Sequence, residues 1–416
     1  MTSVDIAIIG AGAAGLAAGK ACQALGKSFV VLEAKDRIGG RAYTESEIFG
    51  TPWDCGGHWL HSASVNPLRV MADELGVEYL KRRSFLNLHL HLGTGWADAA
   101  TRAACDAAME ADFDASEALG RAGRDVAVVE AFDTGGRWFR LTDHMSEAIS
   151  ALRVDQISTL DYHHYSDTEE NWPVVAGYGA LVAACGAGVP VSLETTVSAV
   201  DYTGAGVVLT TSKGTVKARA VIITVSTNVL ASGRIRFTPG LPVALSRALE
   251  AVPTGLANKV VVQFSRDVFG LPETSNLYFM DERDATRPAR SFQIRPFGQE
   301  MAIDYLGGAQ AVEWEAAGEA ATFDATKRVL ADVFGNDILK HVTKMAATSW
   351  GTDPHTLGAY SCALAGAAGQ RAVLGEPVQE KIYLAGEAVH PTWFSTVHGA
   401  WASGRETAEK VAAGLG

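Results

Sequence analysis

The first part of the chain alternates apolar runs with a helical segment, a pattern typical of a parallel α/β unit. Residues 4–9 (VDIAII) form a partly β-branched apolar run that ends at Gly10, as buried parallel strands do. The next segment (LAAGKACQALG) predicts a helix that ends near Gly26, and residues 28–32 (SFVVL) predict a second strand. The order strand, helix, strand predicts an α/β fold with a parallel sheet.

The middle of the chain follows a different pattern. Residues 66–142 hold Ala-rich, acidic segments that predict two or three amphipathic helices. From residue 189 to 225, apolar and polar positions alternate between turn residues, which predicts a β-meander and then a buried strand. A further strand is predicted at 257–264 and a helix near 321–333. We therefore expect helices and additional strands besides the first parallel unit.

The turn between the first predicted strand and helix contains the spacing GxGxxG, at Gly10, Gly12 and Gly15. In a dinucleotide site the first glycine permits a tight turn, the second lets the backbone approach the pyrophosphate, and the third lets the helix pack on the strands. Glu33 closes the second strand, where a carboxylate can accept hydrogen bonds from ribose hydroxyls. The glycines alone are a weak signal, but with these elements around them they favour dinucleotide binding over a structural turn.

Two double-glycine segments follow this acid. Residues 37–41 (RIGGR) place two glycines before Arg41, whose guanidinium can pair with phosphate oxygens. Residues 53–61 (WDCGGHWLH) gather aromatic side chains and histidines around a second pair of glycines. This density is more typical of a site lining than of a surface turn.

The C-terminal segment has the same density. Residues 381–385 predict a strand, and Gly386 and Glu387 stand at its carboxyl end, where open parallel sheets bind their ligands. Residues 390–404 then lead into a terminal helix. Because a helix N-terminus stabilises negative charge, its first turn is expected to face an electron-rich group.

Charge and cysteine content exclude several classes of protein. The 416 residues carry 35 Lys+Arg and 47 Asp+Glu, and a net charge of −12 is a poor match to nucleic acid. The five cysteines show no CxxC and no Cys/His pairing at metal spacing, so we expect neither a disulfide framework nor a metal site. His163 and His164 are adjacent and point apart on any regular element, which also argues against a metal.

No basic leader precedes the first apolar run, and no apolar stretch reaches about 18 residues. We therefore expect a cytoplasmic protein with no membrane partner.

Together these motifs resemble those of the FAD-dependent amine oxidases, the family of monoamine oxidases, polyamine oxidases and flavin-dependent histone demethylases. The similarity runs along nearly the whole chain. It is carried by GAGAAG with Glu33, RIGGR, DCGGHWLH, VIITVSTNVL, NKVVVQF, WGTDP with GAYS, and LAGEAVHPTWFSTVHGAWASG. The WLH and TVHGA elements are more similar to the polyamine oxidase and demethylase branch.

The resemblance implies the two-domain amine oxidase fold. A Rossmann-like FAD-binding domain is expected from residues 1–65, 188–240 and 375–416. A substrate-binding domain of mixed sheet and helices is expected from residues 66–187 and 241–374.

The resemblance also implies which residues face the cofactor and the substrate. The matching cofactor positions are Gly10, Gly12, Gly15, Glu33, Gly40, Arg41, Gly57, Trp59, Val197, Trp350, Gly386, Glu387 and Val397. The local pattern around Lys259 is typical of a lysine on an edge strand. By resemblance, however, Lys259 matches the family's flavin lysine and is expected to be catalytic. His61 matches a histidine near the substrate of polyamine oxidases, and we expect a catalytic role for it too.

Some positions depart from the family pattern. Ser62 replaces a glycine and Ser226 a proline, so the loop at Ser226 is expected to differ. Tyr360 stands where some members carry a flavin-linking cysteine, which implies non-covalent FAD, although Cys362 lies two residues later. The expected substrate-lining residues are Tyr360, Trp393, Phe394 and Thr396.

The implied reaction is oxidation of an amine to an imine, which water hydrolyses to an aldehyde or ketone while O2 becomes H2O2. The expected partners are O2 and a polyamine or another small primary or secondary amine. A homodimer is also expected, because dimers are the commonest oligomers. Asp167, Glu169 and Glu170 are candidate anchors for a substrate ammonium, or simply a solvated loop. The absence of a large insertion argues against a histone-tail substrate.

Three other functions stay open at this stage. An L-amino-acid oxidase needs an arginine for the carboxylate, for which Arg82 and Arg295 are candidates. A flavin desaturase or protoporphyrinogen-type oxidase shares the N-terminal block but usually lacks Lys259 and the TVHGA end. A catalytically silent FAD-binding protein is disfavoured by Lys259, Glu387 and the aromatic lining.

Overall fold

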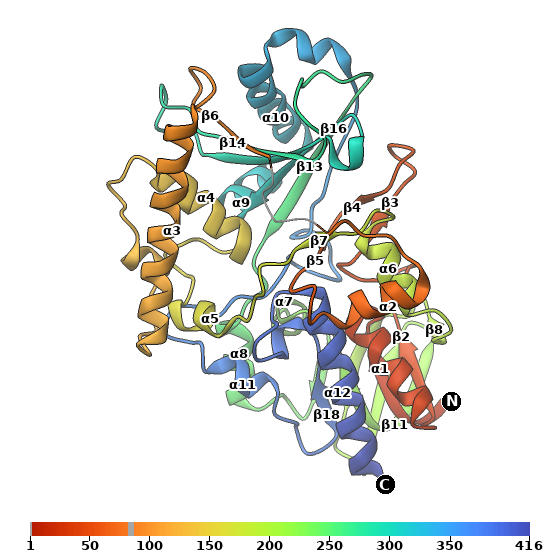
Figure 1. Cartoon of the computed structure of the whole chain (residues 1–416). Coiled ribbons are helices and arrows are strands. Elements are labelled where there is room, and N and C mark those ends of the chain that lie inside the picture. Colours follow the sequence, from red (N-terminus) through yellow and green to blue (C-terminus); the bar gives the residue numbers. More distant parts are fainter. Residues whose placement is uncertain (1, 82–86) are drawn as a thin grey trace.

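The computed structural model describes residues 2–81 and 87–416, and Arg82 lies outside these residues. Two large sheets organise the chain, one near the two termini and one at the opposite end of the molecule (Figure 1). Small paired strands lie between them. These are β3 (Thr44–Glu45) with β4 (Trp53–Asp54) and β5 (Trp59–Leu60) with β7 (Trp172–Pro173).

The first sheet combines a parallel core with an antiparallel meander. Its strands in spatial order are β12 (Arg236–Thr238), β9 (Val197–Asp201), β10 (Val207–Thr211), β11 (Gly214–Ile223), β1 (Thr2–Ile9), β2 (Phe29–Leu32) and β8 (Val191–Ser192), with β18 (Ile382–Leu384) also paired to β11. The apolar runs expected to be buried strands are β1, β2, β11 and β18, and they pair in parallel. In contrast to the expected meander from residue 189, β8 pairs in parallel with β2.

Two helices cover one face of the first sheet. Figure 1 shows α1 (Ala13–Ala24) beside α12 (Val397–Leu415), and residues of both belong to one buried cluster. Small residues make this close approach possible. A Cβ at Gly404 would lie 2.0 Å from the Ala14 carbonyl oxygen, and a Cβ at Gly15 would lie 1.9 Å from that of Gly10. The third glycine of GxGxxG is therefore a packing residue here, as expected.

The core of the first sheet extends beyond the segments assigned to it from the sequence. Helices α2 (Pro67–Leu75) and α6 (Tyr178–Cys185) contribute to the cluster around α1, and α8 (Val243–Ala251) and α11 (Gln370–Leu374) contribute to the cluster on the opposite face. The strands of the two sheets do fall within the expected segments. We propose that the cofactor domain also includes these helices.

The second sheet is antiparallel except at one edge. Its order is β17 (Val342–Ala347), β13 (Ala257–Phe264), β16 (Met301–Gly307), β15 (Arg290–Ile294), β14 (Ser275–Phe279) and β6 (Leu88–His91), where only the pair β14 and β6 is parallel. The helices around it are α3 (Ala99–Arg121), α4 (Phe139–Ser150), α9 (Gly308–Ala317) and α10 (Glu319–Phe334). Residues of α10 pack on one cluster, whereas α3 and α4 pack on another.

Two short helices complete the structure, α5 (Thr159–His164) and α7 (Thr227–Ala231). Ser226, which departs from the family pattern, caps α7. Its Oγ accepts a hydrogen bond from the Val229 N–H at 3.2 Å and donates one to the Thr356 carbonyl at 2.5 Å. A serine therefore starts this helix in the way N-cap residues do.

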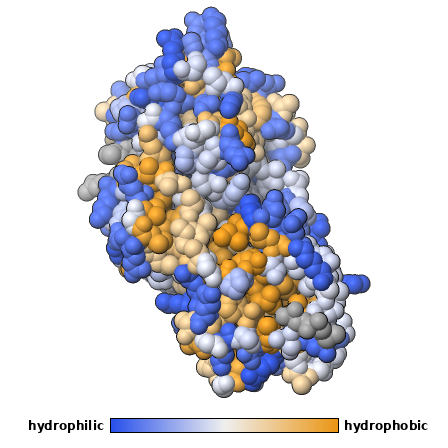
Figure 2. All heavy atoms as spheres, turned by 90° about the vertical axis from the view of Figure 1, so that its right-hand side faces the viewer, coloured by the Kyte–Doolittle hydropathy of each residue, from blue (hydrophilic) through white to orange (hydrophobic). Residues whose placement is uncertain are grey.

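The face toward the right of Figure 1 carries a broad apolar area, shown in orange in Figure 2. Helix α2 lies on this side, and its Val70 and Leu75 are 44% and 50% exposed. Exposed apolar side chains are common in monomers, so the homodimer stays a prediction. Among the described residues, no helix combines the length and apolar character needed to cross a bilayer.

Candidate functional site

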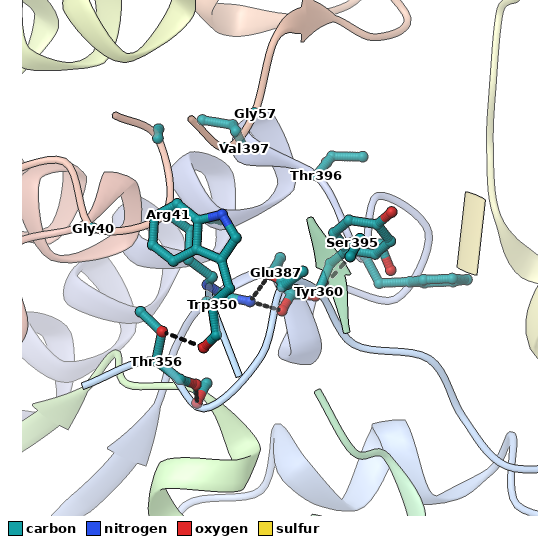
Figure 3. Close-up of a pocket in the computed structure, with 18 of the residues that line it drawn as sticks. Gly40, Arg41, Gly57, Trp350, Thr356, Tyr360, Glu387, Ser395, Thr396 and Val397 are labelled. Carbon is teal, nitrogen blue, oxygen red and sulfur yellow. Dashed lines mark hydrogen bonds and ion pairs between the residues drawn. The ribbon is translucent and has the colours of Figure 1, made fainter. Parts of the chain in front are cut away.

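A cavity of about 1260 Å³ connects the two sheets and collects most of the predicted site residues (Figure 3). At one end it is lined by the first strand–helix turn, and at the other by the second sheet and helices α3 and α5. The predicted residues in its wall are Gly10, Gly12, Glu33, Gly40, Arg41, Gly57, Trp59, His61, Val197, Lys259, Trp350, Tyr360, Gly386, Glu387, Phe394, Thr396 and Val397. Gly15 and Trp393 are not part of this lining.

The glycine turn leaves open backbone at the first end of the cavity. Gly10 has φ +102°, and a Cβ there would lie 2.5 Å from Thr224 Oγ1. Gly12, in contrast, faces open space, because the nearest atom to an added Cβ is Gly40 Cα at 3.8 Å. The N-terminus of α1 thus opens onto the cavity, which fits a pyrophosphate.

Glu33 is buried at the end of β2 and closes this part of the cavity. Its Oε2 accepts a hydrogen bond from the Ala11 N–H at 2.7 Å, and its Oε1 accepts one from the Lys35 N–H at 2.9 Å. A carboxylate has lone pairs left for ribose hydroxyls. Val197 of β9 and Gly386, which has φ +140° and no atom near its Cβ position, line the same cavity.

Arg41 and Glu387 form an ion pair in the middle of the cavity wall (Figure 3). Arg41 Nη1 lies 2.9 Å from Glu387 Oε1 and also donates to the Ala359 carbonyl at 2.7 Å. Burial by itself would raise the pKa of Glu387, but the Arg41 cation and the Ser361 hydrogen bond hold this pKa below its ordinary value. The carboxylate is therefore ionised and fixed.

The start of α12 is packed against the second double-glycine segment. A Cβ at Gly57 would lie 2.6 Å from Val397 Cγ2, so a larger residue there would displace the Val397 side chain. Thr396 caps the helix, with its Oγ1 accepting from the Gly399 N–H at 3.0 Å. Figure 3 shows Gly57, Val397 and Thr396 along one side of the cavity. Trp350 faces this region and donates from Nε1 to the Cys55 carbonyl at 3.0 Å.

Lys259 enters the cavity from β13 of the second sheet, and it is 8% exposed. Its Nζ donates to the carbonyl oxygens of Asp54 and Gly56, each at 2.7 Å. Burial lowers the pKa of Lys259 to about 8, although the nearby Asp54 carboxylate acts in the opposite direction. The amine is thus held in place by two hydrogen bonds, and its pKa lies well below that of an ordinary lysine.

The backbone that holds Lys259 is itself fixed by the buried side chain of Asp54. This carboxylate accepts hydrogen bonds from Thr44 Oγ1 at 2.6 Å, His58 Nδ1 at 3.0 Å, Tyr178 N at 3.0 Å and Gly179 N at 3.2 Å. Burial would raise the pKa of Asp54, but the His58 partner and the Lys259 cation keep it below the ordinary value of 3.8.

The substitution Asp54→Asn is expected to destabilise the fold by about 2–4 kcal/mol, because it leaves buried donors without a carboxylate. A depressed pKa stabilises the fold above the unfolded-state value of 3.8 and loses this contribution as the pH falls through the folded-state pKa. The difference between wild type and variant should therefore be present at pH 7 and shrink below about pH 4. Urea unfolding at both pH values measures it.

Asp155→Asn is a suitable control for this prediction. Asp155 pairs with Arg153 at 3.0 Å, but the two side chains are 53% and 58% exposed. Screening by water should keep the effect at about 1 kcal/mol or less. Equal effects of the two substitutions would contradict the assignment of Asp54 as the anchor of this segment.

His61 and Trp59 line the cavity beside Lys259. His61 Nδ1 is hydrogen-bonded to the Asn171 side-chain oxygen, and burial lowers the pKa of His61 although Asn171 and Asp167 act against this. The ring is therefore neutral, and with Nδ1 donating to Asn171 its Nε2 is the acceptor. Trp59 stacks on Tyr305 with ring centres 5.6 Å apart.

The predicted aromatic cage is only partly assembled as expected. Tyr360 and Phe394 line the cavity, and the Tyr360 hydroxyl donates to the Ala148 carbonyl. Trp393 instead stacks on His390 at 4.9 Å and approaches His398 at 5.1 Å. Its side chain packs within the C-terminal loop, so the structure does not place it at the cavity.

Several lining residues were not found by sequence reasoning. They are Phe113 of α3, Tyr162 of α5 and Tyr165 directly after it, and Tyr278, Phe292 and Tyr305 from the second sheet. Tyr305 pairs directly with Lys259 across β16 and β13, so the register of the sheet brings them together. The period-two pattern of these strands is visible in the sequence, but their register is not.

Two buried cysteines line the cavity, Cys55 and Cys362. Burial raises the pKa of the Cys55 thiol to about 12. Burial raises the pKa of the Cys362 thiol as well, so both thiols stay protonated and are poor nucleophiles. Non-covalent attachment of the cofactor stays a prediction.

The outer part of the cavity is acidic. Asp114 and Glu117 of α3 line it together with Asp167 and Glu169, whereas Glu170 does not. Glu117 accepts a hydrogen bond from His163 Nδ1 at 2.7 Å. These carboxylates make the entrance favourable to cationic molecules.

Arginine is scarce in the described part of the lining. Arg41 and Arg234 are the arginines that line it in residues 2–81 and 87–416, and Arg41 is engaged by Glu387. Arg295, a candidate for binding a substrate carboxylate, is not in the lining and pairs with Asp267 and Glu300 instead. Arg295 is therefore not placed to bind a substrate carboxylate in this cavity.

Comparisons with known proteins agree with this geometry. The family model of flavin containing amine oxidoreductases matches residues 134–412, and that of the NAD(P)-binding Rossmann-like domain matches residues 8–75. Lysine-specific histone demethylase 1 homolog 2 of Oryza sativa subsp. japonica is 27% identical over 98% of this chain, which spans 57% of that protein. Polyamine oxidase 4 of the same organism is 29% identical over 98% of this chain and 88% of its own length.

A solved structure of putrescine oxidase, a triple mutant with redesigned cofactor binding, has the same fold. Its TM-score is 0.82 at 20% identity, and the match covers 99% of each chain. The present chain spans little more than half the length of the demethylases that it matches.

Proposed function

Since the chain belongs to the family of flavin-containing amine oxidoreductases, we propose that it oxidises a small amine next to its nitrogen, with FAD as cofactor and O2 as electron acceptor. The observation that supports this best is the single cavity that joins the glycine turn, the buried Lys259 and an acidic entrance. The product would be an imine, which water hydrolyses to an aldehyde or ketone, while O2 is reduced to H2O2.

The lining has places for each part of FAD. The turn at Gly12 and the N-terminus of α1 would hold the pyrophosphate, and Glu33 the adenosine ribose. Glu387 and Arg41 would contact the chain between the phosphates and the ring, with Val397 at the ring itself. When bound, FAD supplies the acceptor for the hydride equivalent that leaves the substrate carbon.

The protein would contribute position, proton handling and exclusion of water. Neutral His61 can accept a hydrogen bond from the substrate nitrogen, because its Nδ1 is engaged by Asn171. A neutral imidazole can also accept the extra proton of an ammonium group, and only the deprotonated amine has a lone pair to assist C–H cleavage. The aromatic walls at Trp59, Tyr305 and Phe394 would hold the carbon skeleton.

The acidic entrance supports a substrate with a second cationic group, that is, a diamine or polyamine. Asp114, Glu117, Asp167 and Glu169 lie at the outer end of the lining, away from the glycine turn. An ammonium group there would gain favourable electrostatic energy while the other amine reaches the inner cavity as a neutral group. Spermidine and putrescine are therefore the first substrates to examine.

The substitution Glu117→Gln is expected to raise the KM for a diamine by about fivefold to tenfold, because a partly buried charge–charge contact is lost. The KM for a monoamine such as benzylamine should change little, because it has no second charge. Steady-state assays of peroxide formation give both constants. An equal rise for both amines would contradict a role of Glu117 in binding the second cation.

A histone-lysine demethylase activity is the second candidate, since demethylases of Oryza sativa, Homo sapiens and Mus musculus are among the relatives. In such a reaction the lysine side chain would occupy the same inner cavity, and the rest of the peptide would lie at the entrance. The cavity mouth would then have to accept a chain on both sides of the lysine, whereas a diamine needs one narrow path.

One experiment separates these functions. The visible spectrum of the anaerobic holoenzyme should be bleached by putrescine or spermidine and less efficiently by benzylamine. Bleaching by a methylated histone-lysine peptide alone would favour demethylation, and bleaching by L-amino acids alone would favour an amino-acid oxidase. A flavin that none of these reduces would contradict amine oxidation.

A further inference from the structure

A buried chain of polar groups crosses the wall between the cofactor end and the substrate end of the cavity. It runs from Asp161 through Arg371 and Ser361 to Glu387 and Arg41. Neither Asp161 nor Arg371 belongs to the sequence motifs that identify the cofactor site. Their contacts indicate what they do.

Arg371 and Asp161 form a bidentate ion pair out of reach of solvent. Arg371 Nε lies 2.9 Å from Asp161 Oδ1, and Nη2 lies 2.7 Å from Oδ2. The two residues are 4% and 1% exposed. Asp161 Oδ2 also accepts a hydrogen bond from the Ala363 N–H at 2.8 Å. Such a pair adds little net stability over an apolar pair, so its geometry is the property to explain.

The third nitrogen of the guanidinium, Nη1, is hydrogen-bonded to Ser361. Arg371 Nη1 donates to Ser361 Oγ at 3.0 Å and to the Ala388 carbonyl at 2.9 Å. Because Ser361 Oγ already accepts this hydrogen bond, its own hydrogen is directed to Glu387 Oε2 at 2.6 Å. Arg371 therefore orients the hydroxyl that fixes one oxygen of Glu387, while Arg41 fixes the other.

The face of the same guanidinium lies on a ring of the cavity wall. The Arg371 carbon Cζ is 3.9 Å from the centre of the Phe394 ring, and Tyr165 meets this ring edge-on at 5.5 Å. Phe394 and Tyr165 both line the cavity. A planar cation stacked on one face holds the ring in a single orientation.

We propose that Arg371, held by Asp161, is a positioning residue that sets both the carboxylate of Glu387 toward the cofactor and the ring of Phe394 toward the substrate. The inference rests on the proposed function for its substrate half only. Its cofactor half concerns binding of FAD and is measurable without any turnover.

The test begins with Arg371→Lys, which keeps a cation beside Asp161 but cannot form the bidentate pair, reach Ser361 and cover the ring at once. The dissociation constant for FAD, measured by flavin fluorescence on reconstitution, is expected to rise about tenfold or more. The KM for the amine should rise as well, because Phe394 is released.

Arg290 offers a matched control. It forms an equally buried ion pair with Asp304 and lies 3.9 Å from the Trp314 ring centre, but it contacts neither Ser361 nor Phe394. Arg290→Lys should lower the thermal midpoint of the protein to a comparable extent and leave the FAD dissociation constant unchanged. An equal loss of FAD affinity in both variants would reduce the role of Arg371 to general stability.

A double-mutant cycle tests the path through Ser361. Ser361→Ala should weaken FAD binding by itself, and adding it to Arg371→Lys should have almost no further effect on FAD affinity. Fully additive losses would overturn the proposed path. If Arg371→Lys does not fold, wild-type FAD affinity of Ser361→Ala alone would overturn it equally.

The measurements of flavin reduction and of FAD affinity distinguish a failure of the proposed function from a failure of the positioning role. A wild-type flavin that no amine reduces contradicts amine oxidation but leaves the FAD-affinity cycle intact. Unchanged FAD affinity and unchanged KM in Arg371→Lys, in an enzyme that does oxidise amines, contradict the positioning role alone.

Discussion

Replacing Lys259 by methionine is expected to slow the reaction of the reduced enzyme with O2 by about 100-fold, the usual size of the loss when a positioned acid–base or charged group is removed. Lys259 Nζ already donates to two backbone carbonyls, each at 2.7 Å. The charged amine has a third N–H that can donate to another group, whereas the neutral amine has a lone pair in that place. Methionine keeps the volume and removes both possibilities.

The pH dependence of this rate gives a sharper signature. Because the pKa of Lys259 is lowered to about 8, the group changes charge between about pH 7 and pH 9. We expect the wild-type rate to fall as the pH rises through this value, as the cation that favours negative charge on oxygen is lost. Stopped-flow reoxidation from pH 6.5 to 9.5 should show this inflection in the wild type and none in the variant.

Lys344→Met is a matched control on the neighbouring strand. Lys344 Nζ also donates to a backbone carbonyl, that of Ile48 at 2.6 Å, but it is exposed. Its removal should leave reoxidation unchanged. A Lys259→Met enzyme that reoxidises at the wild-type rate, at every pH, would show that this lysine has no part in the reaction.

Alanine at Gly12 is expected to weaken FAD binding without loss of stability, whereas alanine at Gly15 is expected to lower stability. A Cβ at Gly12 finds its nearest neighbour at 3.8 Å, and the residue has φ −73°, so Gly12→Ala should fold normally. The added methyl group would occupy the space of the pyrophosphate and weaken FAD binding by about 100-fold or more. A Cβ at Gly15 would lie 1.9 Å from a carbonyl oxygen, so Gly15→Ala should lower stability by about 3 kcal/mol or more.

Thermal unfolding of the apoprotein and FAD titration separate these two outcomes. Gly12→Ala should unfold like the wild type but bind FAD poorly. Gly15→Ala should unfold at a clearly lower temperature. Gly26→Ala provides a control for backbone effects away from the cavity. Gly26 has φ +66°, and no atom lies near its Cβ position. Normal FAD affinity in Gly12→Ala would place the pyrophosphate elsewhere.

Much of the cofactor half could be predicted because its signals are local. Gly10, Gly12, Gly15 and Glu33 lie within one βαβ unit, where sequence spacing fixes spatial position. The family comparison confirms the predicted amine oxidase fold and flavin cofactor. Lys259, in contrast, is distinguished from an edge-strand lysine only by resemblance, and the structure then places it in the cavity.

The substrate half was harder to predict because its contacts are long-range. Arg371 meets Asp161 from 210 positions away, and no periodic pattern marks either residue. Trp393 shows the reverse error, since an aromatic residue near a motif was expected in the lining but packs on His390. Sequence shows which side chains are available, whereas sheet register and loop packing decide which of them reach the cavity.

The order of the strands has a mechanical consequence. The chain passes from the first sheet at β2 to the second at β6, returns for β8 to β12, crosses again for β13 to β17 and comes back at β18. Two units joined by several separate crossings are more restricted in their relative motion than units joined by one linker, because each crossing has to bend at the same place. Under the proposed function, amine and aldehyde would exchange through the acidic part of the lining while the two sheets keep their places.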